Sequence, residues 1–123
     1  MKLIRVGKIT ETITKFIPDV LDLSIMQSEG LKKHIEKRHP ECVEYIKLIP
    51  SIIQEPDYIG INPNEYDKSF ELIKTFSEHI QIGIKIDISQ EYYYVATLHT
   101  ITQSKLERRV KSGRLNKVDM WHF

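Results

Sequence analysis

The sequence predicts an α+β protein, in which an N-terminal helical region with short leading strands packs on a four-stranded antiparallel sheet, followed by a basic C-terminal helix. Three observations carry this prediction: proline-interrupted helical spacing over Ser28–Gln54, strict alternation of isoleucine over Ile80–Ile88, and a cluster of basic residues over Lys105–Lys117. The 123 residues are enough for one hydrophobic core, so we expect a single domain over residues 1–123.

The first twenty-six residues predict two short strands, about Leu3–Ile9 and Val20–Ile25. Between them Ile13, Phe16 and Ile17 recur at helical spacing, which predicts a short amphipathic segment.

The helical region begins at Ser28, a suitable N-cap for a helix that runs to about Arg38. Pro40 cannot continue that helix because it has no N–H, but it is well suited to the first turn of a new one. The inward face of the new helix is expected to carry Val43, Ile46 and Ile49. Pro50 opens a further turn and Pro56 ends it, so the region should change direction twice.

The sheet is expected to follow as a meander. Tyr58–Ile61 predicts a short strand, the Asn-Pro-Asn sequence after it a turn, and Ser69–Phe76 a second strand. The alternating segment Ile80–Ile88 is typical of a strand with one buried face. Tyr92–Ile101 follows after a three-residue turn, so these last two strands should form an antiparallel hairpin.

The C-terminal segment concentrates positive charge that the net charge of +1 conceals. The basic residues of this segment are Lys105, Arg108, Arg109, Lys111, Arg114 and Lys117. Because Glu107 is its one acid, the segment carries +5 and the remainder of the chain −4. We expect a helix that ends near Gly113 and presents a phosphate-facing surface; a merely solvated helix face is the alternative.

The composition disfavours several other classes of protein. No run approaches the roughly 18 apolar residues of a membrane span, and the N-terminus is too polar for a signal peptide, so we expect a cytoplasmic location and no membrane partner. The single cysteine, Cys42, excludes an internal disulfide and is expected to be a small buried hydrophobe. His34 and His39 are five residues apart and do not match common zinc motifs, so we expect no metal.

The strand alternation also selects candidate polar residues. The isoleucines should face the core, which turns Lys85 to the opposite, open face of the sheet. Alternation divides the next strand into two faces, with Ala96, Leu98 and Thr100 on one and Tyr93, Val95, Thr97 and His99 on the other. If Ala96 and Leu98 pack inward, Lys85, Thr97 and His99 meet on the open face. A half-exposed histidine without a role is the alternative reading of His99.

A second cluster lies where the helical region breaks. His34 and Arg38 are four residues apart and project from one helix face, whereas His39 precedes Pro40 and can reach away from the helix body. A polar helix surface, with a histidine near the negative end of the helix dipole, is the alternative. Cleavage of RNA by its own 2′-OH needs a proton acceptor, a proton donor and positive charge, which histidine, lysine and arginine supply without a metal.

Three segments together carry a resemblance to a known family: HIEKRHPECVEYIKLIPSIIQEPDYI, GIKIDI and YYVATLHTITQSKLERRVKSGRL. The chain resembles the phage-type barnase–EndoU–colicin–RelE-like nuclease domains from about Val6 to Val118. The resemblance implies helices followed by a four-stranded antiparallel sheet. It also implies RNA cleavage without metal or other cofactor, leaving a 2′,3′-cyclic phosphate.

The resemblance further implies an active site built from a helical histidine, here His34 or His39 beside Arg38, and from polar residues of the sheet. Thr97 matches the sheet hydroxyl, while Lys85 and His99 are added by the alternation argument. The residues expected to bind substrate are Thr100, Ser104, Lys105, Arg108, Arg109 and Arg114, of which Thr100 and Ser104 could also replace Thr97.

The sequence thus favours an endoribonuclease, a toxin or effector of a phage or mobile element that acts on tRNA, mRNA or rRNA and is neutralised by an antitoxin or immunity protein. One alternative is a non-catalytic RNA- or protein-binding module with the same fold. Another is an interaction subunit that uses its apolar tail, Met120–Phe123.

Overall fold

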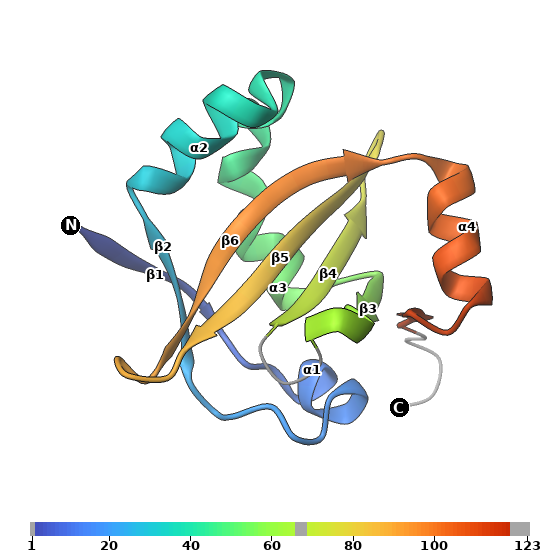
Figure 1. Ribbon diagram of the computed structural model, residues 1–123, viewed down its shortest axis with the longest axis horizontal. Helices are drawn as coiled ribbons and strands as arrows, with labels where there is room; N and C mark the ends of the chain where they lie inside the picture. Colours follow the sequence, from blue (N-terminus) through green and yellow to red (C-terminus); the bar gives the residue numbers. More distant parts are fainter. Residues whose placement is uncertain (1, 66–68, 119–123) are drawn as a thin grey trace.

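A computed structural model describes residues 2–65 and 69–118 of the chain (Figure 1). Its elements are β1 (Leu3–Lys8), α1 (Glu11–Phe16), β2 (Ser24–Ser28), α2 (Gly30–Arg38), the 3₁₀ helix η1 (Pro40–Leu48), α3 (Ile49–Gln54), β3 (Tyr58–Gly60), the 3₁₀ turn η2 (Pro63–Glu65), β4 (Ser69–Thr75), β5 (His79–Asp87), β6 (Tyr92–Ile101), α4 (Gln103–Lys111) and β7 (Leu115–Lys117). The apolar tail at Met120–Phe123 lies outside the described residues, so its proposed role in an interface stays a prediction.

All seven strands belong to one sheet, in the order β1-β2-β6-β5-β4-β3-β7. The prediction of a four-stranded antiparallel sheet was therefore wrong: the sheet is mixed, because β2 pairs parallel with β6, and it extends past the β3–β6 meander on both sides. The parallel pair matches only Ile25 with Tyr93 and Met26 with Tyr94. These partners lie far apart in the chain and are joined by no turn, so no local pattern identifies them.

The main core lies between one face of the sheet and the helices α1 to α3, of which α3 passes behind the central strands in Figure 1. Ile80, Ile82 and Ile84 are fully buried, as the alternation predicts. Burial then fades along β5, since Ile86 is only partly buried and Ile88 is 75% exposed beyond the end of the strand. Cys42 is buried in the same core, as expected, and burial raises the pKa of its thiol.

A bulge in β6 changes which residues face the core. Gly83 pairs with Thr97 and Ile84 with Val95, so Ala96 is the extra residue between the two pairs. The alternation therefore reverses at Ala96: Val95 and Tyr93 are buried on the core side, not on the open face as uninterrupted alternation predicted. Thr97 follows the bulge and lies on the open face, as predicted.

The helical region breaks where proline predicted. His39 has φ −143° and ψ 64°, outside the helical region, and Pro40 occupies the first turn of the next helix. Two details differ from expectation: Ser28 ends β2 and does not cap α2, which starts at Gly30 without a side-chain cap, and the segment after Pro40 is a 3₁₀ helix. The chain turns at His39 because its non-helical dihedrals end α2.

The basic segment forms a helix that ends just before Gly113, as predicted, and its last residues form a strand that the sequence did not predict. Thr102 caps α4 by accepting a hydrogen bond from the Lys105 N–H, and Gly113, with φ +86°, takes the left-handed conformation expected after a helix. The chain then forms β7 beside β3. A small second core holds α4 against the open face of the sheet; it comprises Ile73, Ile101, Leu106 and Leu115.

Over the two described ranges, no helix has the length and apolar character needed to cross a lipid bilayer.

Candidate active site

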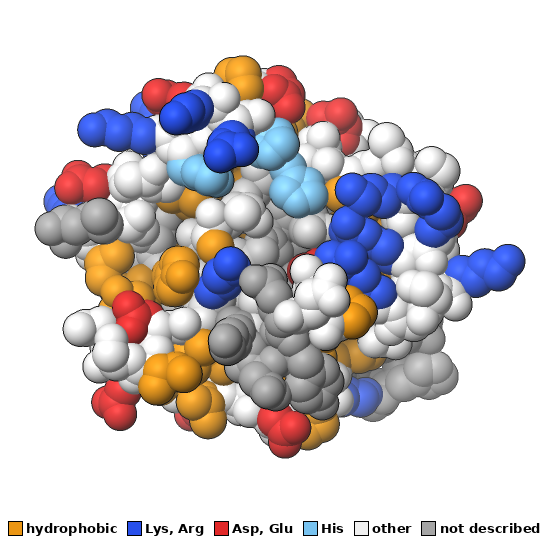
Figure 2. Space-filling model, viewed as in Figure 1, with side chains coloured by type: hydrophobic (Ala, Val, Ile, Leu, Met, Phe, Trp, Pro, Cys, Tyr) orange, Lys and Arg blue, Asp and Glu red, His pale blue; other side chains and the backbone are white. Residues whose placement is uncertain are grey.

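The open face of the sheet carries a polar patch beside α4. Strand register places Glu71, Gly83 and Thr97 in one row across β4, β5 and β6, and Gln81 opposite His99 in the next row. Figure 2 shows this face, where histidine side chains gather next to a group of lysine and arginine side chains. The patch therefore combines hydroxyl, imidazole, carboxylate and cationic groups within a few strand positions.

Two histidines from distant segments meet on this face. The ring of His39 lies 5.6 Å from the ring of His99, measured between centroids. His39 arrives there because α2 lies beside β6 and ends at Arg38, directly before His39. Its side chain is 43% exposed, and its Nδ1 lies 3.9 Å from Glu41 Oε1. His39, and not His34, is the helical histidine that reaches the sheet.

A chain of hydrogen bonds defines the tautomer of His99. Arg109 Nη1 donates to Gln81 Oε1 over 2.8 Å, which directs the Gln81 amide nitrogen toward His99 Nε2, 3.4 Å away. His99 Nε2 must then carry the lone pair, because the amide NH₂ can only donate. At the other side of the ring, Nδ1–H donates to the carbonyl oxygen of Thr100 over 3.1 Å. His99 is thus held in the form that can accept a proton at Nε2.

Burial keeps His99 neutral over a wider pH range than usual. Desolvation lowers its pKa below 6.5, and the nearby charges of His39, Lys105 and Arg109 lower it further. The hydrogen bond to the Thr100 carbonyl opposes this shift without cancelling it. A neutral imidazole with its lone pair at Nε2 is equipped to act as a base near neutral pH.

A buried ion pair lies one row away. Glu71 is only 6% exposed, and its Oε1 accepts a hydrogen bond from Arg114 Nη2. Within residues 2–65 and 69–118, Glu71 Oε2 and Arg114 Nε are buried without a hydrogen-bond partner. Buried polar atoms are normally paired, so these two atoms are exceptions, and the ion pair uses only part of its hydrogen-bonding capacity.

Gly83 lies between Glu71 and Thr97 in this row. A Cβ at Gly83 would lie 2.6 Å from Thr97 Oγ1, which is too close for any side chain at this position while Thr97 stays in place. The glycine therefore lets the Thr97 hydroxyl lie over β5, toward the side of the row that carries the ion pair.

The positive charge near the patch comes from Arg109 and Arg114. Arg109 is partly buried, and desolvation together with the charge of Arg114 lowers the pKa of its guanidinium. Both groups remain charged, because arginine retains its proton throughout the physiological range. Two close guanidinium groups facing one carboxylate leave an excess of positive charge for an anion.

The remaining candidates lie outside this cluster. His34 and Arg38 are exposed on α2, and Lys85 lies one row further along β5, opposite Tyr94. The Thr100 side chain faces away from the patch, although its carbonyl orients His99. Three further candidates, Ser104, Lys105 and Arg108, are exposed on α4.

The residues that sequence reasoning missed are Glu71 and Gln81. Both lie in strands among buried apolar residues, and both are themselves buried. Glu71 stands between Phe70 and Leu72, which pack into the main core, so alternation alone places it on the open face. A charged residue on the open face of a central strand was the signal in the sequence that could have identified Glu71 as a site residue.

We find no group of three or more histidine, cysteine, aspartate or glutamate side chains, within the described ranges, that could hold a metal ion.

Comparison with known proteins identifies the family. Residues 4–108 match the family model described as phage-Barnase-EndoU-ColicinE5/D-RelE like nuclease 3. No curated protein and no solved structure shows significant similarity to the chain. The match covers most of the chain, including His39, Glu71, Gln81 and His99. The chain belongs to this family of phage-type nucleases.

Proposed function

We propose that this protein is an endoribonuclease that cleaves RNA without a metal, by attack of the 2′-OH on the adjacent phosphate, leaving a 2′,3′-cyclic phosphate. The observation that carries the proposal is the His39–His99 pair, with Nε2 of His99 held as an acceptor beside Arg109. RNA supplies the nucleophile in this reaction, so the protein needs to move protons and stabilise charge only.

His99 takes the proton of the 2′-OH at Nε2, where the 2′-OH replaces the long 3.4 Å contact with the Gln81 amide. Its lowered pKa keeps it neutral, and the Arg109–Gln81 chain holds the ring in the required tautomer. His39 gives a proton to the departing 5′-oxygen, since it is the more solvent-exposed partner and can recover its proton from water. The cleavage step leaves His99 protonated and His39 neutral, and proton exchange of both imidazoles with water restores the starting state.

Arg109 and Arg114 stabilise the phosphorane, in which negative charge builds up on the phosphate oxygens. An arginine fork can bind two such oxygens at once. Glu71 orients Arg114 through their ion pair. The Thr97 hydroxyl, which lies over Gly83 in the same row as Glu71, is a further donor to the phosphate.

The rate of cleavage should depend on the protonation of His99. We expect the rate to fall on acidification, with a midpoint below pH 6.5, because protonated His99 cannot accept the 2′-OH proton. Initial rates on an oligoribonucleotide between about pH 4.5 and 8 would measure this. A midpoint above 6.5 would contradict the assignment of His99 as the base.

The same pKa shift affects the stability of the fold. Because the pKa of His99 is lower in the folded protein than its unfolded value of about 6.5, protonation favours the unfolded chain. The contribution of the neutral imidazole to folding is therefore complete above pH 6.5 and is lost as the pH falls through the folded pKa.

The proposal is tested by incubating the purified protein with total RNA and with tRNA in excess EDTA, beside His39→Ala and Thr97→Ala variants. We expect discrete products that end in a cyclic phosphate, lost with His39→Ala and reduced with Thr97→Ala. Cleavage that requires added metal would refute the metal-independent mechanism. If no RNA is cut under any condition but RNA is still bound, a binding module becomes the better description.

The biological setting follows from the same proposal. A phage-type endoribonuclease acting on tRNA, mRNA or rRNA in the cytoplasm would serve as a toxin or effector. A cell that makes such an enzyme needs an antitoxin or immunity protein to cover the arginine and histidine patch until the activity is required.

A further inference from the structure

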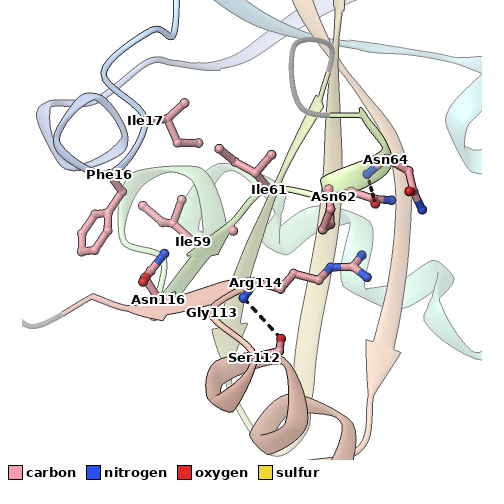
Figure 3. A pocket seen from close by; sticks show the side chains of 12 residues that line it. Phe16, Ile17, Ile59, Ile61, Asn62, Asn64, Ser112, Gly113, Arg114 and Asn116 are labelled. Carbon is pink, nitrogen blue, oxygen red and sulfur yellow. Dashed lines mark hydrogen bonds between the residues drawn. The ribbon is translucent and has the colours of Figure 1, made fainter.

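A cavity of about 580 Å³ opens next to the candidate active site, where β3 ends and β7 begins. Its walls come from the end of α1, from the segment after β3 and from the turn between α4 and β7. Figure 3 shows the side chains of Phe16, Ile17, Ile59 and Ile61 forming an apolar part, with Asn62 and Asn64 on the other side. This volume lies within the range of small-molecule sites.

Arg114 joins the cavity to the active site. The residue lines the cavity, while its guanidinium reaches Glu71 on the open face of the sheet. In Figure 3 its side chain extends toward Asn62 and Asn64, away from Phe16. A ligand with an anionic group at Arg114 could therefore place its uncharged part in the cavity.

We infer that this cavity binds a nucleobase of the RNA whose phosphate occupies the active site, an inference that rests on the proposed ribonuclease function. A base has apolar faces and a polar edge, and the cavity offers both kinds of surface. Aromatic and aliphatic side chains such as Phe16 and Ile61 suit the faces, since stacking on an aromatic ring tolerates any base.

Asparagine amides suit the edge, because each has a donor and an acceptor. The backbone N–H of Asn64 donates to Asn62 Oδ1 over 3.0 Å, which orients the Asn62 amide and leaves its NH₂ group as a donor. Asn116 lines the cavity from β7 with an exposed side chain.

The rigid framework of the cavity supports a selective site. A Cβ at Gly60 would lie 2.3 Å from the carbonyl oxygen of Arg114, so β3 and the turn before β7 approach too closely for any other residue. The Ile61 N–H also donates to that carbonyl over 3.3 Å. These contacts join the segment after β3 to the turn before β7, so the backbone positions of the asparagines around the cavity are set by the fold, and the oriented Asn62 amide presents its NH₂ group to one edge of a base.

The inference is tested by titrating the intact protein with each of the four nucleoside 3′-monophosphates and with inorganic phosphate, followed by two-dimensional NMR. We expect at least one nucleotide to shift the side-chain amide signals of Asn62, Asn64 and Asn116, and to bind more tightly than phosphate. Phe16→Ala should weaken nucleotide binding by about fivefold or more and leave phosphate binding unchanged.

Two further variants keep the test decisive. Asn116→Ala alters an exposed side chain and should weaken nucleotide binding without unfolding the protein. Phe76→Ala is the matched aromatic control; this exposed phenylalanine follows β4 at the end away from the cavity and should change nothing. Nucleotides that bind no better than phosphate, or that bind equally well to the Phe16 and Asn116 variants, would overturn the inference.

Binding is measured without cleavage, so the two proposals fail separately. Nucleotide binding in the cavity by a protein that cuts no RNA would uphold the subsite and refute the enzyme. RNA cleavage with no nucleotide binding up to about 10 mM would uphold the enzyme and refute the subsite.

Discussion

His99→Ala is expected to lower the rate of RNA cleavage at least about a hundredfold, because a positioned proton acceptor contributes on the order of 10²–10⁴ to such reactions. The variant removes the imidazole whose Nε2 faces Gln81 and whose ring lies beside His39. Initial rates on a fluorescent oligoribonucleotide in EDTA would measure the loss, with thermal unfolding to verify the fold.

The matched control is His34→Ala, which removes an exposed imidazole from α2 and should leave the rate unchanged. The double variant His39→Ala/His99→Ala should be little slower than the slower single variant, since residues that act as one unit lose their effect together. If His99→Ala is fully active and Glu71→Gln is inactive, the proton acceptor is the buried Glu71 carboxylate and not His99.

Arg114→Ala is expected to destabilise the fold by about 2–3 kcal/mol, because it leaves the Glu71 carboxylate buried without its cation. The cost lies at the lower end of the range for broken buried pairs, since the Arg114 side chain is itself 25% exposed. Urea unfolding would measure the effect as a shift of the midpoint.

Two comparisons separate charge from packing. Arg108→Ala, an exposed arginine of α4, should change stability by no more than about 0.5 kcal/mol. Glu71→Met/Arg114→Met removes both charges and should recover most of the stability lost by Arg114→Ala. If the double variant is no more stable than Arg114→Ala, the ion pair is not the cause of the loss.

Local patterns in the sequence are sufficient to predict most individual elements. The isoleucines of β5 alternate because one face is buried, and Pro40 ends α2 because proline cannot occupy a helix interior. Gly113 marks the end of α4 for a similar reason, since glycine readily takes a positive φ. Each of these signals acts within a few residues of its effect.

The sheet required information that no local signal contains. The parallel pair of β2 with β6, and the short strand β7 at the edge beside β3, depend on which distant segments share a core. The bulge at Ala96 is likewise a property of two paired strands, and it moved Tyr93 and Val95 to the core.

For the candidate site, the sequence by itself determined the residue types and two of the segments that carry them: the end of the first helix, with His34 or His39, and the strand face that carries Thr97 and His99. Only the tertiary structure decided their partners. Glu71, Gln81 and Arg109 join the site because β4, β5 and α4 pack together, and the cavity near Arg114 exists because β3 and β7 pair. Side-chain chemistry is local, whereas proximity between distant segments depends on how the whole core is buried.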